Sequence, residues 1–125
     1  MKILVVDDEE GARDLFNTIL TDEGYEVSLA NGGEEALGLF KSNPFNLVIT
    51  DIKMPVMDGL QLLQEIRKMG SKTDVIMVTA YGEVESYLKA MSLGAAEYIN
   101  KPIRIKELKQ IVHKVLTEQR ARSDS

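Results

Sequence analysis

The sequence predicts a doubly wound α/β fold, with a five-stranded parallel sheet in the order 2-1-3-4-5 and five helices covering its two faces. Two observations predict it. Short runs of aliphatic residues alternate along the 125 residues with segments whose apolar residues recur at helical spacing. The connections are short and carry glycine, proline, asparagine or aspartate, which are typical of turns. Parallel strands need crossover helices, and right-handed crossovers distribute those helices over both faces.

The composition fits one domain that builds its core without disulfides or a structural metal. The chain has no cysteine, which excludes a disulfide scaffold, a thiol nucleophile and a zinc–cysteine site, and fits a reducing cytoplasm. Its net charge is −5, so we expect no nucleic-acid contact by this domain, because phosphate contacts need a clustered basic surface. No apolar run approaches membrane-spanning length, and the first residues lack a signal-peptide pattern. We therefore expect a cytoplasmic protein without a membrane contact.

The first strand is expected at Ile3 to Val6, where aliphatic residues form a continuous run. Continuous rather than alternating apolarity is typical of a strand covered on both faces. The helix that follows is favoured at its start by Glu9 and Glu10 and is closed by Gly24. Its inward stripe is expected to hold Ala12, Leu15, Phe16, Ile19 and Leu20.

Residues 25–30 alternate between apolar and polar and predict a half-covered strand at an edge of the sheet. The turn Asn31-Gly32-Gly33 then leads into a short helix at 34–41. The residues expected to face inward from this helix are Ala36, Leu37 and Phe40.

The stretch Leu47–Gly59 organises the rest of the chain. Its aliphatic first residues predict a buried strand that ends in one carboxylate, Asp51. Pro55 and the glycine at the end of the stretch mark a turn. Asp58 is the better N-cap for the helix expected at 58–69, so Asp51 is left without a structural role. That helix is expected to bury Leu62, Leu63 and Ile66.

The second half of the chain continues the alternation, with a strand expected at 74–78, a helix at 83–93, a strand at 97–100 and a helix at 105–119. The helix at 83–93 has a thin apolar stripe formed by Val84, Leu88 and Met91. The last helix is expected to bury Leu108, Ile111, Val112, Val115 and Leu116. We expect residues 1–119 to form the domain and the polar residues 120–125 to be a frayed tail or the start of a linker.

In this topology the carboxyl ends of the strands face one crevice, where open α/β sheets bind their ligands. The polar residues delivered there are Asp7, Asp8, Asp51, Thr79 and Lys101. Carboxylates this close repel each other, by about 4 kcal/mol per pair at about 4 Å and an effective dielectric of about 20. Separately solvated acids are the alternative, but three acids, a hydroxyl and a cation at one edge favour a site. Oxygen ligands point to a hard cation, and magnesium fits best because it tolerates few carboxylates.

Such a cluster can recruit magnesium and then accept a phosphate. The metal and Lys101 would offset the charge of the phosphoryl oxygens, while the Thr79 hydroxyl would donate a hydrogen bond to one of them. Asp51 would be the nucleophile, because carboxylates form acyl phosphates.

These residues, taken in order, resemble the receiver domains of two-component response regulators, the CheY-like superfamily with a flavodoxin-like fold. The resemblance covers essentially the whole chain. It rests on Leu4-Val5-Val6-Asp7-Asp8-Glu9, on Asp51 followed by Met54-Pro55 and Met57-Asp58-Gly59, on Thr79-Ala80, and on Glu97-Tyr98-Ile99-Asn100-Lys101-Pro102. No single piece is specific, whereas their joint order and spacing are.

The resemblance implies that Asp51 takes a phosphoryl group from a phosphohistidine on a sensor histidine kinase or a phosphotransfer protein. It also implies that Asp8 and Asp51, and more distantly Asp7, hold magnesium. The backbone carbonyl of Lys53 would be a further ligand.

The resemblance also places Lys101 on the phosphoryl group, before a cis bond to Pro102, and it supplies a switch. Thr79 would be drawn toward the phosphate, which opens space for the ring of Tyr98 to turn inward. The face made by the fourth helix, fifth strand and fifth helix would then change, to control an output or a homodimer. Without the resemblance, Tyr98 reads as a core or rim aromatic.

Two rival functions have weaker support. An aspartate-nucleophile phosphatase on a similar fold usually carries a second acid two residues after the nucleophile, where this chain has Lys53. A flavin-binding protein of the same topology would need hydroxyl-rich phosphate-binding turns, whereas the turn after the first strand is acidic. We therefore expect a signalling module, not an enzyme, which assists only its own phosphorylation and dephosphorylation.

Three further residues and one stretch have weaker functional signals. His113 is expected to face solvent from the last helix. The side chains of Lys53 and Tyr81 flank the site and are expected to tune the lifetime of the phosphate. Residues 78–85 are most similar to receivers attached to enhancer-dependent transcription activators, or to stand-alone phosphorelay receivers.

Overall fold

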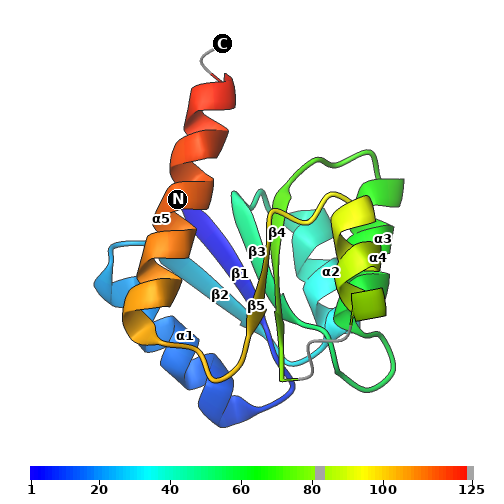
Figure 1. Cartoon of the computed structure of the whole chain (residues 1–125), viewed down its shortest axis with the longest axis horizontal. Helices are drawn as coiled ribbons and strands as arrows, with labels where there is room; N and C mark the ends of the chain where they lie inside the picture. The colour runs from blue at the N-terminus through cyan, green and yellow to red at the C-terminus, as the bar shows by residue number, and fades with distance from the viewer. Residues whose placement is uncertain (81–83, 124–125) are drawn as a thin grey trace.

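A five-stranded parallel sheet forms the centre of the computed structural model, which describes residues 1–80 and 84–123 (Figure 1). The strands run in the order β2-β1-β3-β4-β5, and all neighbouring pairs are parallel. They are β1 (Lys2–Val6), β2 (Glu26–Ala30), β3 (Leu47–Asp51), β4 (Asp74–Thr79) and β5 (Glu97–Asn100). This topology confirms the fold predicted from the sequence.

Five helices cover the sheet from both sides, and Figure 1 shows α1 and α5 on one face and α2, α3 and α4 on the other. Their bounds are α1 (Glu10–Asp22), α2 (Gly33–Ser42), α3 (Gly59–Lys68), α4 (Val84–Ser92) and α5 (Ile105–Ser123). The predicted start of the fourth helix at Glu83 lies outside the described residues.

Alternation along the buried strands separates two hydrophobic cores. In β1, Ile3 and Val5 face the core beneath α1 and α5, whereas Leu4 and Val6 face the core beneath α2 and α3. The three central strands are buried almost throughout, as their continuous aliphatic runs predicted. The carboxyl ends of these strands therefore lie on a rigid base.

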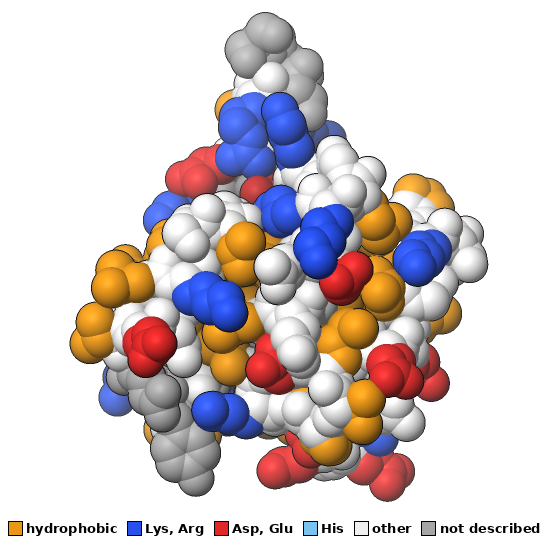
Figure 2. Space-filling view, turned by 90° about the vertical axis from the view of Figure 1, so that its right-hand side faces the viewer, with side chains coloured by type: hydrophobic (Ala, Val, Ile, Leu, Met, Phe, Trp, Pro, Cys, Tyr) orange, Lys and Arg blue, Asp and Glu red, His pale blue; other side chains and the backbone are white. Residues whose placement is uncertain are grey.

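The apolar stripe predicted for α4 is wrong. Val84, Leu88 and Met91 are 74%, 60% and 38% exposed, whereas Ala90 is buried. The helix turns its small residue toward the domain, which allows a close approach but buries little apolar surface. On the side of the molecule that carries α3 and α4, hydrophobic side chains form small groups between charged ones (Figure 2).

In α1 the inward stripe is narrower than predicted. Phe16, Ile19 and Leu20 are buried and Ala12 is half-buried, but Leu15 is 53% exposed. Leu15 lies at the rim of a groove of about 470 Å³ between α1 and the start of α5. The side chain thus borders the packed face without entering it.

Helix α5 continues four residues beyond its predicted end at Gln119. The added turn is held at the amino-terminal edge of the sheet by the buried carboxylate of Asp74. Arg122 Nη2 donates to Asp74 Oδ2 at 2.8 Å, and Gln119 Nε2 donates to the same oxygen at 3.0 Å. Figure 1 shows this end of α5 projecting beyond the sheet. Within the described residues, no helix combines the length and the apolarity needed to cross a membrane.

Candidate functional site

Three carboxylates meet at the carboxyl-terminal edge of the sheet. Asp51 is the last residue of β3, and Asp7 and Asp8 follow β1 directly. One oxygen from each lies within 4.8 Å of the others. Asp7 and Asp51 are only 1% and 9% exposed, whereas Asp8 is exposed to solvent. The prediction that these three acids converge at one edge of the sheet is therefore confirmed.

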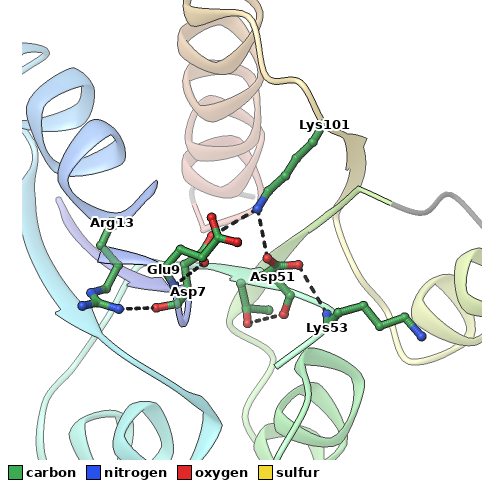
Figure 3. A network of polar contacts seen from close by, with 7 residues as sticks. Asp7, Glu9, Arg13, Asp51, Lys53 and Lys101 are labelled. Carbon is green, nitrogen blue, oxygen red and sulfur yellow. Dashed lines mark hydrogen bonds and ion pairs between the residues drawn. The ribbon is translucent and has the colours of Figure 1, made fainter. Parts of the chain in front are cut away.

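Lys101 bridges the two buried acids. Its Nζ lies 3.0 Å from Asp51 Oδ2 and 3.3 Å from Asp7 Oδ2 (Figure 3). The backbone N–H of Lys101 donates to the carbonyl oxygen of Thr79 at 2.7 Å, beside the last β4–β5 pair, which joins Thr79 and Asn100. The bond from Lys101 to Pro102 is cis, as the family resemblance implied.

Burial and charge set the protonation of this group. The pKa of Asp51 is raised by burial and by the neighbouring Asp7, although the hydrogen bond from Lys101 opposes the shift. Burial tends to lower the pKa of Lys101, but its contacts with Asp51 and Asp7 outweigh burial and raise it. Lys101 thus remains a cation that partly compensates two buried anions.

Backbone and side-chain donors orient Asp51. The N–H of Lys53 donates to Asp51 Oδ1 at 3.3 Å, and the hydroxyl of Thr50 donates to the carbonyl oxygen of Asp51 at 2.9 Å. The Lys53 side chain is exposed and extends away from the carboxylate in Figure 3. The residue two positions after Asp51 is therefore not an acid, and its ammonium group does not contact the Asp51 carboxylate.

Asp7 has a second set of partners that the sequence did not reveal. The N–H of Glu9 donates to Asp7 Oδ1 at 3.0 Å, and Arg13 Nη1 donates to the carbonyl oxygen of Asp7 at 2.8 Å (Figure 3). Arg13 lies one turn into α1, and no motif marks it. These contacts fix the turn between β1 and α1, and hence the direction of the Asp7 carboxylate.

The two predicted switch residues occupy neighbouring strands. Thr79 ends β4 and is fully buried, one residue beyond the partner of Asp51 in the β3–β4 register. Tyr98 lies in β5, and its ring meets the ring of Tyr87 from α4 edge-on, with centroids 5.4 Å apart. Tyr81, expected beside the site, lies outside the described residues. His113 is exposed on α5, as predicted.

Comparison with known proteins identifies the family. Residues 3–113 match the family model described as the response regulator receiver domain. The chain belongs to the response regulator receiver family. This membership agrees with the convergence of Asp7, Asp8, Asp51 and Lys101 at one edge of the sheet, and it supports neither the phosphatase nor the flavoprotein alternative.

Three relatives illustrate the range of this receiver family. The chain is 42% identical to the regulatory protein AtoC of Escherichia coli, over 94% of the chain and 26% of AtoC. It is 37% identical to the sporulation initiation phosphotransferase F of Bacillus subtilis, over 92% of the chain and 93% of that protein. The solved structure of the response regulator protein TrrA of Thermotoga maritima, in complex with Mg(2+)-BeF, has a TM-score of 0.83 and 44% identity, covering 91% of this chain and 97% of TrrA. The chain spans less than half the length of several of the curated relatives that it matches, AtoC among them.

The donors of this receiver domain fit a magnesium ion. All three side chains offer carboxylate oxygens, which hard divalent cations prefer. Two are buried beside a lysine that neutralises them only in part, so a divalent cation would relieve the remaining repulsion. The exposed position of Asp8 leaves one side of the group open to water, which magnesium retains as ligands.

Gly59 allows the start of α3 to approach the end of β3. A Cβ at Gly59 would collide with the backbone carbonyl oxygen of Asp51 and lie 3.0 Å from the Cα of Ile52. The N–H of Gly59 also donates to the Ile52 carbonyl at 2.9 Å, and the Asp58 side chain caps the helix as predicted. The glycine is therefore needed for a close backbone approach that fixes Asp51.

Gly59→Ala is expected to lower the free energy of unfolding by about 1–3 kcal/mol, because the added methyl group forces the backbone of Asp51 and Ile52 aside. Urea denaturation at neutral pH measures this loss. Gly38→Ala is the matched control, since a Cβ at this exposed position of α2 meets nothing within 4 Å. The control should gain about 0.5–1 kcal/mol, because alanine is the better helix former. Equal effects of the two changes would contradict the close approach.

Proposed function

We propose that this receiver domain accepts a phosphoryl group on Asp51 from a phosphohistidine of a sensor histidine kinase or a phosphotransfer protein. The observation that carries the proposal is the position of the Asp51 carboxylate. It is buried at the end of β3, within 3.0 Å of the Lys101 ammonium and beside Asp7 and Asp8. A buried carboxylate with an acidic cluster and a fixed cation around it is suited to covalent capture of a phosphoryl group.

In the proposed transfer, an Asp51 carboxylate oxygen forms a bond to phosphorus while the bond from phosphorus to the donor histidine nitrogen breaks. The bonding electron pair remains with the imidazole, which is then neutral after it takes up a proton. Lys101 is already 3.0 Å from the nucleophile, so its ammonium can stabilise the negative charge of the phosphoryl oxygens. The Thr79 hydroxyl is proposed to donate a hydrogen bond to one of these oxygens.

The proposed metal ligands are the carboxylates of Asp7, Asp8 and Asp51 and the backbone carbonyl of Lys53. Magnesium, when bound, would offset the negative charge of the phosphoryl oxygens. The TrrA structure, solved with Mg(2+)-BeF, supports this choice of metal. The chain itself supplies the alignment of Asp51 through the Lys53 N–H and the compensation of charge through Lys101.

We further propose that phosphorylation shifts the population between two packings of the domain. Thr79 would be drawn toward the phosphate, and the ring of Tyr98 would turn into the space that opens. The face formed by α4, β5 and α5 would then differ in the two states and control an output, or a homodimer formed through this face. A phosphate favours one packing only through a differential contact, which Thr79 provides.

The remaining proposals concern the context of the domain. We propose a cytoplasmic signalling module with no nucleic-acid contact of its own, which assists its own phosphorylation and dephosphorylation but is not otherwise an enzyme. We extend the receiver domain predicted at residues 1–119 to the end of α5, because Arg122 binds Asp74, and we propose that the residues after α5 are a tail or the start of a linker. The relatives of which the chain covers less than half support a linker, whereas phosphotransferase F supports a stand-alone receiver.

The function is tested by the intact mass of the protein after incubation with magnesium and acetyl phosphate. A gain of about 80 Da, lost when magnesium is chelated, is expected for the wild type. Asp51→Asn should show no gain, because the amide cannot form an acyl phosphate. The control is Asp74→Asn, which removes a buried carboxylate at the opposite edge of the sheet and should leave the adduct intact. An equal adduct in Asp51→Asn, or none in the wild type, would refute the proposal.

A further inference from the structure

A single arginine ties α4 to the body of the domain at one end. Arg67, in the last turn of α3, is half-buried. Its guanidinium donates four hydrogen bonds to backbone carbonyl oxygens. Nε and Nη2 bond Leu93 and Gly94 at 2.8 and 3.1 Å, and Nη1 bonds Ser71 and Thr73 at 3.1 and 2.9 Å.

These contacts hold the chain where α4 ends. Carbonyl groups after the last helical turn have no partner within the helix, and the planar fork of an arginine can satisfy two of them at once. Gly94 adopts a left-handed backbone conformation, with φ of 82°, which turns the chain toward β5. Beyond it, the N–H of Ala96 donates to the carbonyl of Val75 at 2.8 Å. The carboxyl end of α4 is thus fixed to α3, to the α3–β4 loop and to the sheet.

Among the described residues, the amino-terminal half of α4 buries little of its surface. Of the nine residues of α4, all of which the structure describes, Ala90 alone is buried. Val84 and Leu88 are 74% and 60% exposed. Tyr87 contributes an edge-on ring contact with Tyr98, the residue proposed to turn inward on phosphorylation. The Tyr98 hydroxyl is buried in this structure, so a rotation of this ring would alter the contact with the first half of the helix and leave the arginine contacts untouched.

We infer that Arg67 is the anchor about which α4 pivots, so that the amino-terminal half of the helix carries the change when Asp51 is phosphorylated. This inference rests on the proposed function, because phosphorylation is its trigger. A nine-residue helix is about 13 Å long, so a rotation of about 10° at its carboxyl end moves its first residue by about 2 Å. The same rotation leaves the last turn almost in place.

Two other movements are compatible with a mobile α4. The whole helix could slide along the sheet, or its last turn could unwind first. Both would break the two Arg67 hydrogen bonds to Leu93 and Gly94, whereas a pivot keeps them. Backbone amides at the two ends of α4 therefore distinguish the movements, because each reports local opening.

The experiment measures amide hydrogen exchange residue by residue by NMR, with magnesium present and with or without acetyl phosphate. Intact mass confirms the 80 Da adduct in the same samples. In the wild type, phosphorylation should change exchange at Leu88 and Lys89 at least tenfold and at Leu93 and Ala95 less than twofold. The N–H groups of Leu93 and Ala95 suit this purpose because both bond the Ala90 carbonyl, at 3.2 and 3.0 Å.

Arg67→Gln should speed exchange at Leu93 and Ala95 at least tenfold before phosphorylation, and phosphorylation should then affect both ends of α4. Arg67→Lys keeps the positive charge but lacks the planar guanidinium. Its exchange rates at Leu93 and Ala95 should lie between those of the wild type and Arg67→Gln, which preserves the test if the glutamine variant folds poorly. Arg122→Lys is the matched control, because that arginine binds Asp74 from α5. It should leave α4 unchanged. Amides of β1 and β3 report whether any effect is global.

A larger change at Leu93 and Ala95 than at Leu88 in the phosphorylated wild type would overturn the pivot. Unchanged protection of Leu93 in Arg67→Gln would overturn the anchor. Absence of the 80 Da adduct would instead refute the proposed function and remove the trigger. The anchor would even then be decided by the unphosphorylated Arg67 variants, so the two failures are distinguishable.

Discussion

Lys101→Met is expected to lower the free energy of unfolding by about 2 kcal/mol at neutral pH in metal-free buffer. The change leaves Asp7 and Asp51 buried without the ammonium that lies 3.3 and 3.0 Å from them. Removing one partner of a buried ion pair costs about 3–5 kcal/mol, and the partial exposure of the lysine reduces that figure. The same variant should accept phosphate from acetyl phosphate at least about tenfold more slowly, because a fixed cation is missing where charge develops.

The stability loss in Lys101→Met should depend on pH in a defined direction. The pKa of Asp51 is already raised in the folded protein, by burial first and also by Asp7, and the lysine opposes that shift. Without the lysine the pKa rises further, so the folded state binds a proton more tightly than the unfolded chain does. The carboxyl group then destabilises the fold above its folded pKa and ceases to do so below its unfolded pKa. The deficit of the variant should therefore shrink as the pH falls from 7 toward 4.

Urea denaturation between pH 4 and pH 8, together with the rate of adduct formation, checks both parts. Lys114→Met is the matched control, since that lysine pairs with Glu97 at 3.1 Å on the surface. It should not reproduce the pH-dependent loss of stability and should not affect phosphorylation, because exposed ion pairs contribute little. A pH-independent deficit in Lys101→Met would mean that the lysine acts by packing rather than by charge.

Most of the fold was predictable because the apolar periodicity and the turn residues indicate the same helices and strands. The continuous aliphatic runs of β1, β3 and β4 predicted burial on both faces, and their burial confirms it. The helical stripe of α3 was correct, since Leu62, Leu63 and Ile66 are fully buried. In α5 the predicted residues Leu108, Val112, Val115 and Leu116 are buried, whereas Ile111 is only half-buried. The strand order 2-1-3-4-5, predicted as the simplest solution for five alternating strands and helices, is the observed one.

The prediction failed for α4, where periodicity was a poor guide. Its apolar residues have helical spacing, yet the helix buries Ala90 and exposes Leu88. Periodicity finds the apolar side of a helix, but which side packs depends on the room that neighbouring elements leave. Near β5 that room suits a small residue. The end of α5 was misjudged for a related reason, because Arg122 is polar by sequence but binds the buried Asp74.

The candidate site was predictable for residues at strand ends and hidden for residues that act through backbone atoms. Topology alone brings Asp7, Asp51 and Lys101 to one edge. Arg13 and Arg67 bind carbonyl oxygens, which every residue carries, so no pairing pattern marks their partners. The backbone of Val56 was also not predictable. Its φ is 70°, a left-handed conformation that β-branched residues rarely adopt, and its side chain is 84% exposed.

Magnesium and Asp51→Asn are expected to reverse each other's effect on stability. Without magnesium, Asp51→Asn should raise the free energy of unfolding by about 1 kcal/mol, because it removes one of three anions within 4.8 Å of one another. At a magnesium concentration about 100 times the dissociation constant, the wild type should gain about 2.7 kcal/mol. The variant should gain much less, since it lacks one carboxylate ligand. The order of stability should therefore invert when magnesium is added.

This inversion separates a metal site from a mere acidic patch. Thermal unfolding in chelator and in a magnesium series measures it, with Asp74→Asn as the control for loss of a buried carboxylate. That control removes the acceptor of Arg122 and Gln119, so it should lose about 1–2 kcal/mol equally with and without magnesium. If Asp51→Asn is stabilised by magnesium as much as the wild type, the ion does not bind through Asp51. If the variant is the less stable one in chelator, Lys101 already compensates the cluster, and repulsion would not be what recruits the ion.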